Sequence, residues 1–135
     1  MILGVGVDLL AVERIARYLE DGDAFFQRAY TSAERREAAG RPDQALYYAG
    51  RFAGKEAVFK CLGTLPEEFR WNEIEILSGP WGAPEVHLDG TCSTRAKEMG
   101  VRTIHLSLTS DTAFAAAFAV AEGDETDGFH GPGVS

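Results

Sequence analysis

The sequence is poor in cysteine, in basic residues and in long apolar runs, and each shortage excludes a class of protein. Cys61 and Cys92 are the only cysteines, too few for a disulfide scaffold, and they form no Cys-x-x-Cys zinc motif. No apolar run approaches the roughly 20 residues that a transmembrane helix needs. The 13 Lys and Arg against 21 Asp and Glu give a formal charge of −8, which disfavours non-specific binding to nucleic acid. We therefore expect no membrane and no nucleic-acid partner.

The first twelve residues are apolar without resembling a secretion signal. They contain no Lys or Arg and place Asp8 within the run, so we interpret them as a buried strand. Without a targeting segment or a disulfide framework, we expect cytoplasmic localisation. The 135 residues fit one domain over residues 1–122 and an acidic tail over residues 123–135, which we expect to be disordered.

Apolar spacing and turn residues predict an α+β fold. The segment from Thr31 to Glu34 has capping-box spacing, and the longest helical pattern runs from Asp43 to Gly63. The order of elements does not alternate as in βαβ units, so we predict a mostly antiparallel sheet packed against the long helix. The other predicted elements are strands at 2–8, 73–77, 85–88, 104–109 and 114–120, and helices at 12–19 and 91–99.

The predicted long helix has the densest set of ionisable residues. Glu56 and Lys60 lie four residues apart on one stripe, and Arg51 and Lys55 lie on the neighbouring stripe. One acid among three bases suits an anionic ligand held with a metal, because Mg²⁺ takes one or two carboxylates together with phosphate oxygens. A solvated ion pair between Glu56 and Lys60 explains the spacing at least as well.

Asp8 is a second candidate, since an acid at the end of an apolar strand lies where ligands often gather. An equally simple interpretation makes Asp8 the N-cap of the following helix.

Two long motifs resemble the holo-acyl-carrier-protein synthase family. The segment GVGVDLLAVERI, from Gly4 to Ile15, is similar to the opening motif of that family. The segment RFAGKEAVFKCLG, from Arg51 to Gly63, is similar to its RFAAKEA motif followed by KALG. Shorter matches lie in order between Ile2 and Gly123, at Phe26, Tyr30–Glu34, the turn Gly82-Ala-Pro84 and the strand His105–Ser110.

The resemblance implies a 4'-phosphopantetheinyl transferase, which moves phosphopantetheine from coenzyme A to a serine of an apo acyl carrier protein. It implies a homotrimer with the coenzyme between subunits, a Mg²⁺ bound by Asp8 and Glu56, and Lys60 stabilising the phosphates. Arg14 and Arg17 would meet the acidic helix of the carrier protein, although their pattern alone fits a solvated helix face. Contacts to the coenzyme would come from Arg51, Lys55, Lys60, Gly82, Pro84, Ser107 and Ser110.

Two positions depart from the family pattern. Ser110 stands where the family has histidine, and Ala83 replaces the lysine of its Gly-Lys-Pro turn. Both changes remove positive charge near the expected nucleotide, so we predict weaker binding of coenzyme A and a smaller preference over dephospho-coenzyme A. They leave open a non-catalytic relative that binds the coenzyme or the carrier protein. A different metal-dependent phosphotransferase or hydrolase remains a third hypothesis.

Four further residues are expected to have structural roles. We interpret His105 as a partly buried strand residue and Cys61 as a small core residue. Trp71 and Trp81 flank the predicted hairpin and are expected to pack against the fold.

Overall fold

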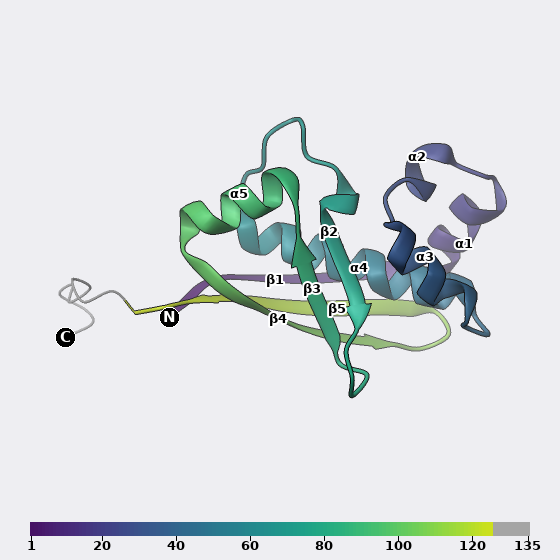
Figure 1. Ribbon diagram of the computed structural model, residues 1–135. Helices are drawn as coiled ribbons and strands as arrows, with labels where there is room; N and C mark the ends of the chain where they lie inside the picture. The colour runs from purple at the N-terminus through teal and green to yellow at the C-terminus, as the bar shows by residue number, and fades with distance from the viewer. Residues whose placement is uncertain (126–135) are drawn as a thin grey trace.

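The computed structural model describes residues 1–125 and confirms the α+β fold, with a long helix packed along an antiparallel sheet (Figure 1). The predicted disorder of the tail concerns residues 126–135, which lie outside the described residues. Gly123 itself still belongs to the last strand. The elements are β1 (Ile2–Ala11), α1 (Val12–Glu20), α2 (Ala24–Gln27), α3 (Ser32–Ala39), α4 (Gln44–Leu62), a 3₁₀ turn (Trp71–Glu73), β2 (Ile74–Ser78), β3 (Pro84–Leu88), α5 (Gly90–Met99), β4 (Val101–Ser110) and β5 (Phe114–Gly123).

The strands form two antiparallel sheets rather than one. Three long strands pair in the order β1-β5-β4, and β2 pairs with β3 as a separate hairpin. Figure 1 shows the hairpin beside the long sheet, where β3 also contacts β4. Each predicted helix and strand is present. The short helix α2 was not predicted, and Asp23 caps it by accepting a hydrogen bond from Phe26 N–H at 2.7 Å.

The long helix α4 packs on the inner face of the β1-β5-β4 sheet. Alternate residues of β5 that face it are alanines, namely Ala115, Ala117, Ala119 and Ala121, all buried. Gly4 and Gly6 of β1 bring the strand backbone against the helix backbone. A Cβ atom at Gly6 would lie 1.9 Å from the Ala57 carbonyl oxygen. The small residues therefore let the helix and the sheet approach more closely than ordinary side chains allow.

We predict that Gly6→Ala lowers the free energy of unfolding by about 2–4 kcal/mol, because strand and helix must separate to admit the methyl group. Urea unfolding would measure the change. Gly50→Ala is the matched control, since no atom lies within 4 Å of the added Cβ and α4 gains a better helix former. Equal stability of the two variants would contradict the predicted backbone clash.

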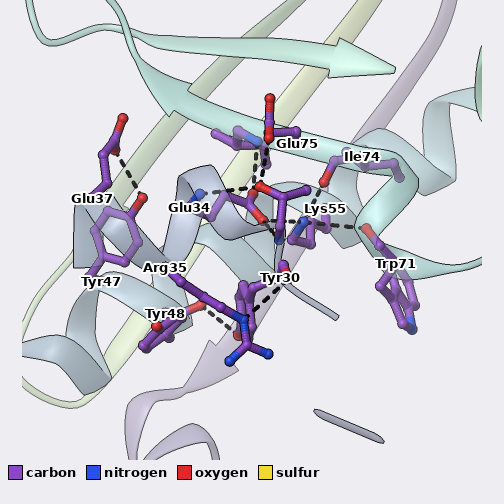
Figure 2. Close-up of polar contacts among 12 residues, drawn as sticks. Tyr30, Glu34, Arg35, Glu37, Tyr47, Tyr48, Lys55, Trp71, Ile74 and Glu75 are labelled. Atoms are coloured by element: carbon purple, nitrogen blue, oxygen red, sulfur yellow. Dashed lines mark hydrogen bonds and ion pairs between the residues drawn. The ribbon is translucent and has the colours of Figure 1, made fainter. Parts of the chain in front are cut away.

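A buried polar cluster joins α3, α4 and β2 (Figure 2). The Lys55 ammonium lies 2.9 Å from Glu34 Oε1, and both side chains are fully buried. Lys55 also donates hydrogen bonds to the Trp71 and Ile74 carbonyls. Glu34 accepts from the Ile76 N–H at 2.8 Å and from the Thr31 N–H at 2.8 Å, which completes the predicted capping box. The cluster pairs each buried charge and fixes β2 to the two helices.

Among residues 1–125, the helices are all too short or too polar to cross a membrane.

Candidate active site

Asp8 lies in the middle of β1, on the face that packs against α4. It is not a helix cap, because Ala11 occupies the N-cap position of α1 and no side chain caps that helix. The Asp8 side chain is 10% exposed, and its Oδ2 atom is buried without a hydrogen-bond partner among the described residues. An unpaired buried carboxylate oxygen is costly, so this atom is suited to bind a ligand.

Glu56 reaches Asp8 from the facing side of α4. Burial and the adjacent carboxylate of Asp8 raise the pKa of Glu56 to about 7. Two neighbouring carboxylates cannot both ionise without cost unless a cation lies between them. The arrangement therefore favours either a shared proton or a bound positive charge.

Lys60 supplies one positive charge at this position. Its ammonium donates to the Val7 carbonyl at 2.8 Å and lies 3.4 Å from Asp8 Oδ1, while the side chain stays half exposed. No ion pair joins Lys60 to Glu56 within residues 1–125, so the proposed solvated pair along the helix is wrong. Lys60 instead contacts β1 through two hydrogen bonds, which leaves one N–H of its ammonium free for a ligand.

Asp8 and Glu56 line a cavity of about 380 Å³ between β1, α1 and α4. Arg14 lines the same cavity, together with the rings of Tyr18, Phe25, Phe26, Phe52 and Trp71. The cavity lining therefore combines Arg14 and three acidic residues, of which Asp23 also caps α2, with aromatic and aliphatic side chains. Such a lining suits the apolar part of a ligand whose charged part lies at the carboxylates.

Arg51 and Ser110 line a second cavity, of about 530 Å³, which shares no lining residue with the first. Arg51 donates to Glu37 Oε1 at 3.0 Å and to Ser78 Oγ at 2.9 Å. Partial burial raises the pKa of Glu37, but hydrogen bonds from the Ser78 N–H, Tyr47 and Arg51 outweigh it and leave that pKa below its ordinary value. Glu37 is therefore ionised at neutral pH and balances the charge of Arg51.

The structure contradicts one predicted coenzyme contact. Lys55 cannot meet a ligand, because its ammonium is enclosed with Glu34 and two backbone carbonyls. Burial lowers the pKa of Lys55, partly offset by Glu34. Lys55 is thus a structural residue, although it is the immediate neighbour of Glu56.

The remaining predicted contacts are distributed over the surface. Gly82 lies in the β2–β3 turn, Pro84 begins β3, and Ser107 is exposed on β4. Arg17 is exposed on α1 and pairs with Glu13 at 3.2 Å. None of these four lines either of the two cavities described above.

Two expectations about structural residues are wrong. His105 is exposed and lies 2.9 Å from Glu122 across the β4–β5 pair. Trp81 is 96% exposed at the tip of the hairpin, whereas Trp71 packs against Phe52 and Phe69 as expected. Cys61 is buried, as predicted.

Sequence reasoning missed Arg41, Glu37 and Tyr47, which complete the surroundings of Arg51. The Arg41 and Arg51 guanidinium carbons lie 5.2 and 4.4 Å from the centre of the Tyr47 ring. In the sequence, only Gly40-Arg41-Pro42 drew attention to this region. These residues predict a break between two helices, but they do not predict the direction of the Arg41 side chain.

The donor set at the first cavity fits a hard divalent cation. It offers the carboxylates of Asp8 and Glu56, and one oxygen of Asp8 is buried without a partner. No group of three or more Asp, Glu, His or Cys side chains that could hold a metal occurs among the described residues, so the protein itself would supply two ligands. Mg²⁺ is commonly held by one or two carboxylates, with substrate phosphate oxygens and water completing its shell. Such a donor set, with Lys60 beside it, is suited to a ligand that carries phosphate groups.

Comparison with known proteins gives the family. Residues 4–121 match the model of the 4'-phosphopantetheinyl transferase superfamily. The chain is 44% identical to the holo-[acyl-carrier-protein] synthase of Anaeromyxobacter dehalogenans over 127 residues, which cover 91% of this chain and 98% of that protein. The chain therefore belongs to the 4'-phosphopantetheinyl transferase superfamily, as the motifs predicted.

Solved structures agree with this assignment. The holo-[acyl-carrier-protein] synthase of Neisseria meningitidis superposes with a TM-score of 0.80 at 33% identity, over 90% of this chain and 99% of that chain. The synthase of Bacillus anthracis, solved in complex with coenzyme A (3',5'-ADP), gives a TM-score of 0.75 at 31% identity, over 92% and 99% of the two chains. The fold described above is thus that of holo-acyl-carrier-protein synthases.

Proposed function

We propose that this chain transfers 4'-phosphopantetheine from coenzyme A to a serine hydroxyl of an apo acyl carrier protein. The observation that best supports the proposal is the pairing of Asp8 and Glu56, with Lys60 beside them, at an aromatic-lined cavity. All three residues fall inside the two motifs that resemble the family. Phosphoryl-group transfer depends mainly on positioning and on neutralising charge, and this donor set supplies both.

The reaction exchanges one phosphorus–oxygen bond for another. The serine oxygen forms a bond to the phosphorus next to the pantetheine arm, and the bond to the bridging pyrophosphate oxygen breaks. The serine proton passes to water, and adenosine 3',5'-bisphosphate leaves with the bridging oxygen. Lys60 is placed to stabilise negative charge that develops on the phosphates, because its ammonium is half exposed beside Asp8.

Asp8 and Glu56 are the residues that would hold Mg²⁺. When bound, this ion neutralises charge on the pyrophosphate of the donor. The pKa of about 7 for Glu56 implies that its carboxyl loses a proton when a cation binds. Arg14 lines the cavity and, with Arg17, a neighbouring surface groove, which supports a role for both in docking an acidic carrier protein.

We also propose a homotrimer, with the coenzyme bound between neighbouring subunits. The outer face of the β1-β5-β4 sheet exposes five large apolar side chains, which an isolated chain rarely leaves open to water. These are Val5, Val7, Leu9, Phe114 and Phe118, each at least 48% exposed. The separation of the carboxylate cavity from the Arg51 cavity also supports a coenzyme that contacts two subunits.

The test is intact-mass analysis of an apo acyl carrier protein incubated with this protein, coenzyme A and Mg²⁺. A mass gain of one phosphopantetheine that disappears when the metal is removed supports the proposed function. Absence of a gain over several carrier proteins, with folded enzyme, favours the non-catalytic binder. Release of phosphate or nucleotide without modification of the carrier indicates a hydrolase.

We predict that Ser110→His lowers the KM for coenzyme A about tenfold. The change restores the family's histidine at a cavity that already holds Arg51, and one charge-assisted hydrogen bond accounts for the gain. Steady-state kinetics with coenzyme A and dephospho-coenzyme A would measure it. The KM for dephospho-coenzyme A should not change, and an equal gain for both donors would contradict the assignment of this cavity to the 3'-phosphate.

A further inference from the structure

The surface groove on α1 has a volume of about 320 Å³ and adjoins the carboxylate cavity, because Arg14 lines both. Its other lining residues are Ala11, Glu13, Arg17, Tyr18 and Asp21. The groove thus contains two acidic side chains beside the two arginines proposed to dock an acidic carrier protein. Neither acid takes part in the proposed transfer, so their place in a docking surface needs a separate explanation.

The charges in the α1 groove are ordered along the helix. Arg14 lies at the end that the groove shares with the carboxylate cavity. Arg17 pairs with Glu13 at 3.2 Å, so these two exposed side chains together contribute no net charge. Asp21 follows Arg14 by seven residues, which places it about 10 Å farther along the helix axis. The groove is therefore positive at the cavity end and negative at the far end.

Asp21 is exposed and occupies the C-cap position of α1. The C-terminal end of a helix carries a partial negative charge, which adds to that of the Asp21 carboxylate. None of the ion pairs within residues 1–125 involves Asp21, so neither Arg14 nor Arg17 neutralises it. A cation that reaches this end of the groove must come from a bound partner.

The order of charges defines the partner that fits the groove. A carrier protein whose docking helix, the helix that lies along α1, is acidic throughout is attracted by Arg14 and repelled by Asp21. A docking helix with an acid opposite Arg14 and a Lys or Arg about two helical turns away satisfies both ends, because two turns span about 11 Å. Like charges that face each other across an interface disfavour the wrong partner, even where each exposed ion pair contributes little affinity.

We propose that Asp21 determines which carrier proteins this enzyme prefers. It favours carriers with a Lys or Arg about two turns from the acid that meets Arg14, and it disfavours carriers whose docking helix is acidic throughout. The proposal rests on the proposed function and adds a repulsive element to the attraction between arginine and acid. Glu13 has a related role, because its pair with Arg17 reduces the attraction for acids in the middle of the groove.

Carrier variants that differ by one charge test this proposal. The probe is an apo acyl carrier protein whose docking helix carries only acids, together with its single Glu→Lys and Asp→Lys variants along that helix. The wild-type enzyme should have a KM about threefold lower for the variant with lysine two turns from the acid that meets Arg14, with kcat unchanged. Asp21→Asn should abolish this preference, and Asp21→Lys should reverse it in favour of the all-acidic carrier.

Glu20→Gln is the matched control. Glu20 is the exposed acid next to Asp21, but it does not line the α1 groove, so its replacement should leave the preference among carriers unchanged. Equal effects of Glu20→Gln and Asp21→Asn would show that only the net charge of the helix end matters and would overturn the role of Asp21. A wild-type enzyme with the same KM for all the carriers would also overturn it.

A binding experiment separates this proposal from the proposed function. Surface plasmon resonance with carriers whose acceptor serine is replaced by alanine needs no coenzyme and no turnover. The lysine variant should bind the wild-type protein about threefold more tightly than the all-acidic carrier does, and Asp21→Asn should bind both alike. If this Asp21-dependent binding occurs but no serine-bearing carrier is modified, the proposed function is wrong and the docking assignment stands. Modification of all carriers without any effect of Asp21 on binding supports the transferase and overturns the role of Asp21.

Discussion

Replacing Glu56 by glutamine is expected to reduce phosphopantetheine transfer about a thousandfold or more while raising the thermal stability of the metal-free protein. The activity falls because glutamine keeps the shape of the side chain but removes one of the two negative ligands proposed for Mg²⁺, and charge neutralisation by the metal accounts for several kcal/mol of barrier lowering. Intact-mass analysis of the carrier protein measures the loss. Glu67→Gln, an exposed carboxylate on the loop after α4, should retain full activity.

The stability gain follows from the raised pKa of Glu56. Between pH 4.5 and about 7 the folded protein holds a proton that the unfolded chain has released, so the stability of the wild type falls as the pH rises through this window. Above pH 7 the ionised Glu56 opposes folding by on the order of 1 kcal/mol, after allowance for its partial exposure. Glutamine removes this cost. The two proteins should melt alike at pH 4, and the variant should melt several degrees higher at pH 8.

Adding Mg²⁺ at pH 8 provides the decisive comparison. The ion should raise the melting temperature of the wild type, because it binds only the folded chain, and should have little effect on Glu56→Gln. A variant that keeps most of its activity, or one that melts below the wild type at pH 8, would be incompatible with the proposed role of the two carboxylates.

Lys55→Met is expected to cost about 3–5 kcal/mol of folding stability, the largest loss that we predict for a single side chain. The change leaves the Glu34 carboxylate buried without its cationic partner and takes the donor away from the Trp71 and Ile74 carbonyls. Because whole domains are stable by only about 5–15 kcal/mol, the variant should be close to unfolding at 37 °C. Urea unfolding followed by circular dichroism would measure the difference.

A double-mutant cycle identifies the origin of this loss. Glu34→Gln combined with Lys55→Met should be less destabilising than the sum of the single changes, since the second change removes the uncompensated charge left by the first. Lys97→Met, at an exposed position of α5, is the matched control and should be within about 0.5 kcal/mol of wild type. Additivity of the two changes would show that packing, rather than the buried charge pair, causes the loss.

Local patterns predicted most of the fold. The capping box at Thr31, the stop at Gly63 and the alternation in the last two strands each determine structure through a few neighbouring residues, and the structure contains every element that they predict. The short helix α2 was missed because four residues contain too little periodicity to recognise. The division into two sheets was also missed, since strand pairing depends on tertiary packing rather than on local pattern.

For the site, the main feature that the sequence could not predict was the direction in which each side chain of α4 points. This helix is covered by strands and helices on several sides, so buried residues occur around most of its circumference and no polar face marks the solvent. Lys55 and Glu56 are adjacent in the sequence, yet one is enclosed in the core and the other lines a cavity. Lys60 was expected along the helix and instead contacts β1, a partner 52 residues away. The position of the Arg41 side chain could not be predicted, because its contacts come from α3, α4 and β2.

The contrasting surroundings of the two tryptophans give the protein two separate optical probes. Trp71 packs against Phe52, Phe59 and Phe69 with ring centres 4.9–5.3 Å apart, so its fluorescence reports on a shielded environment. Trp81 is 96% exposed and should emit as an indole in water does. The red shift of emission on unfolding therefore comes almost entirely from Trp71, and an added quencher such as iodide acts first on Trp81. Because Trp71 also lines the carboxylate cavity, a ligand that fills this cavity should change the short-wavelength emission that comes from Trp71.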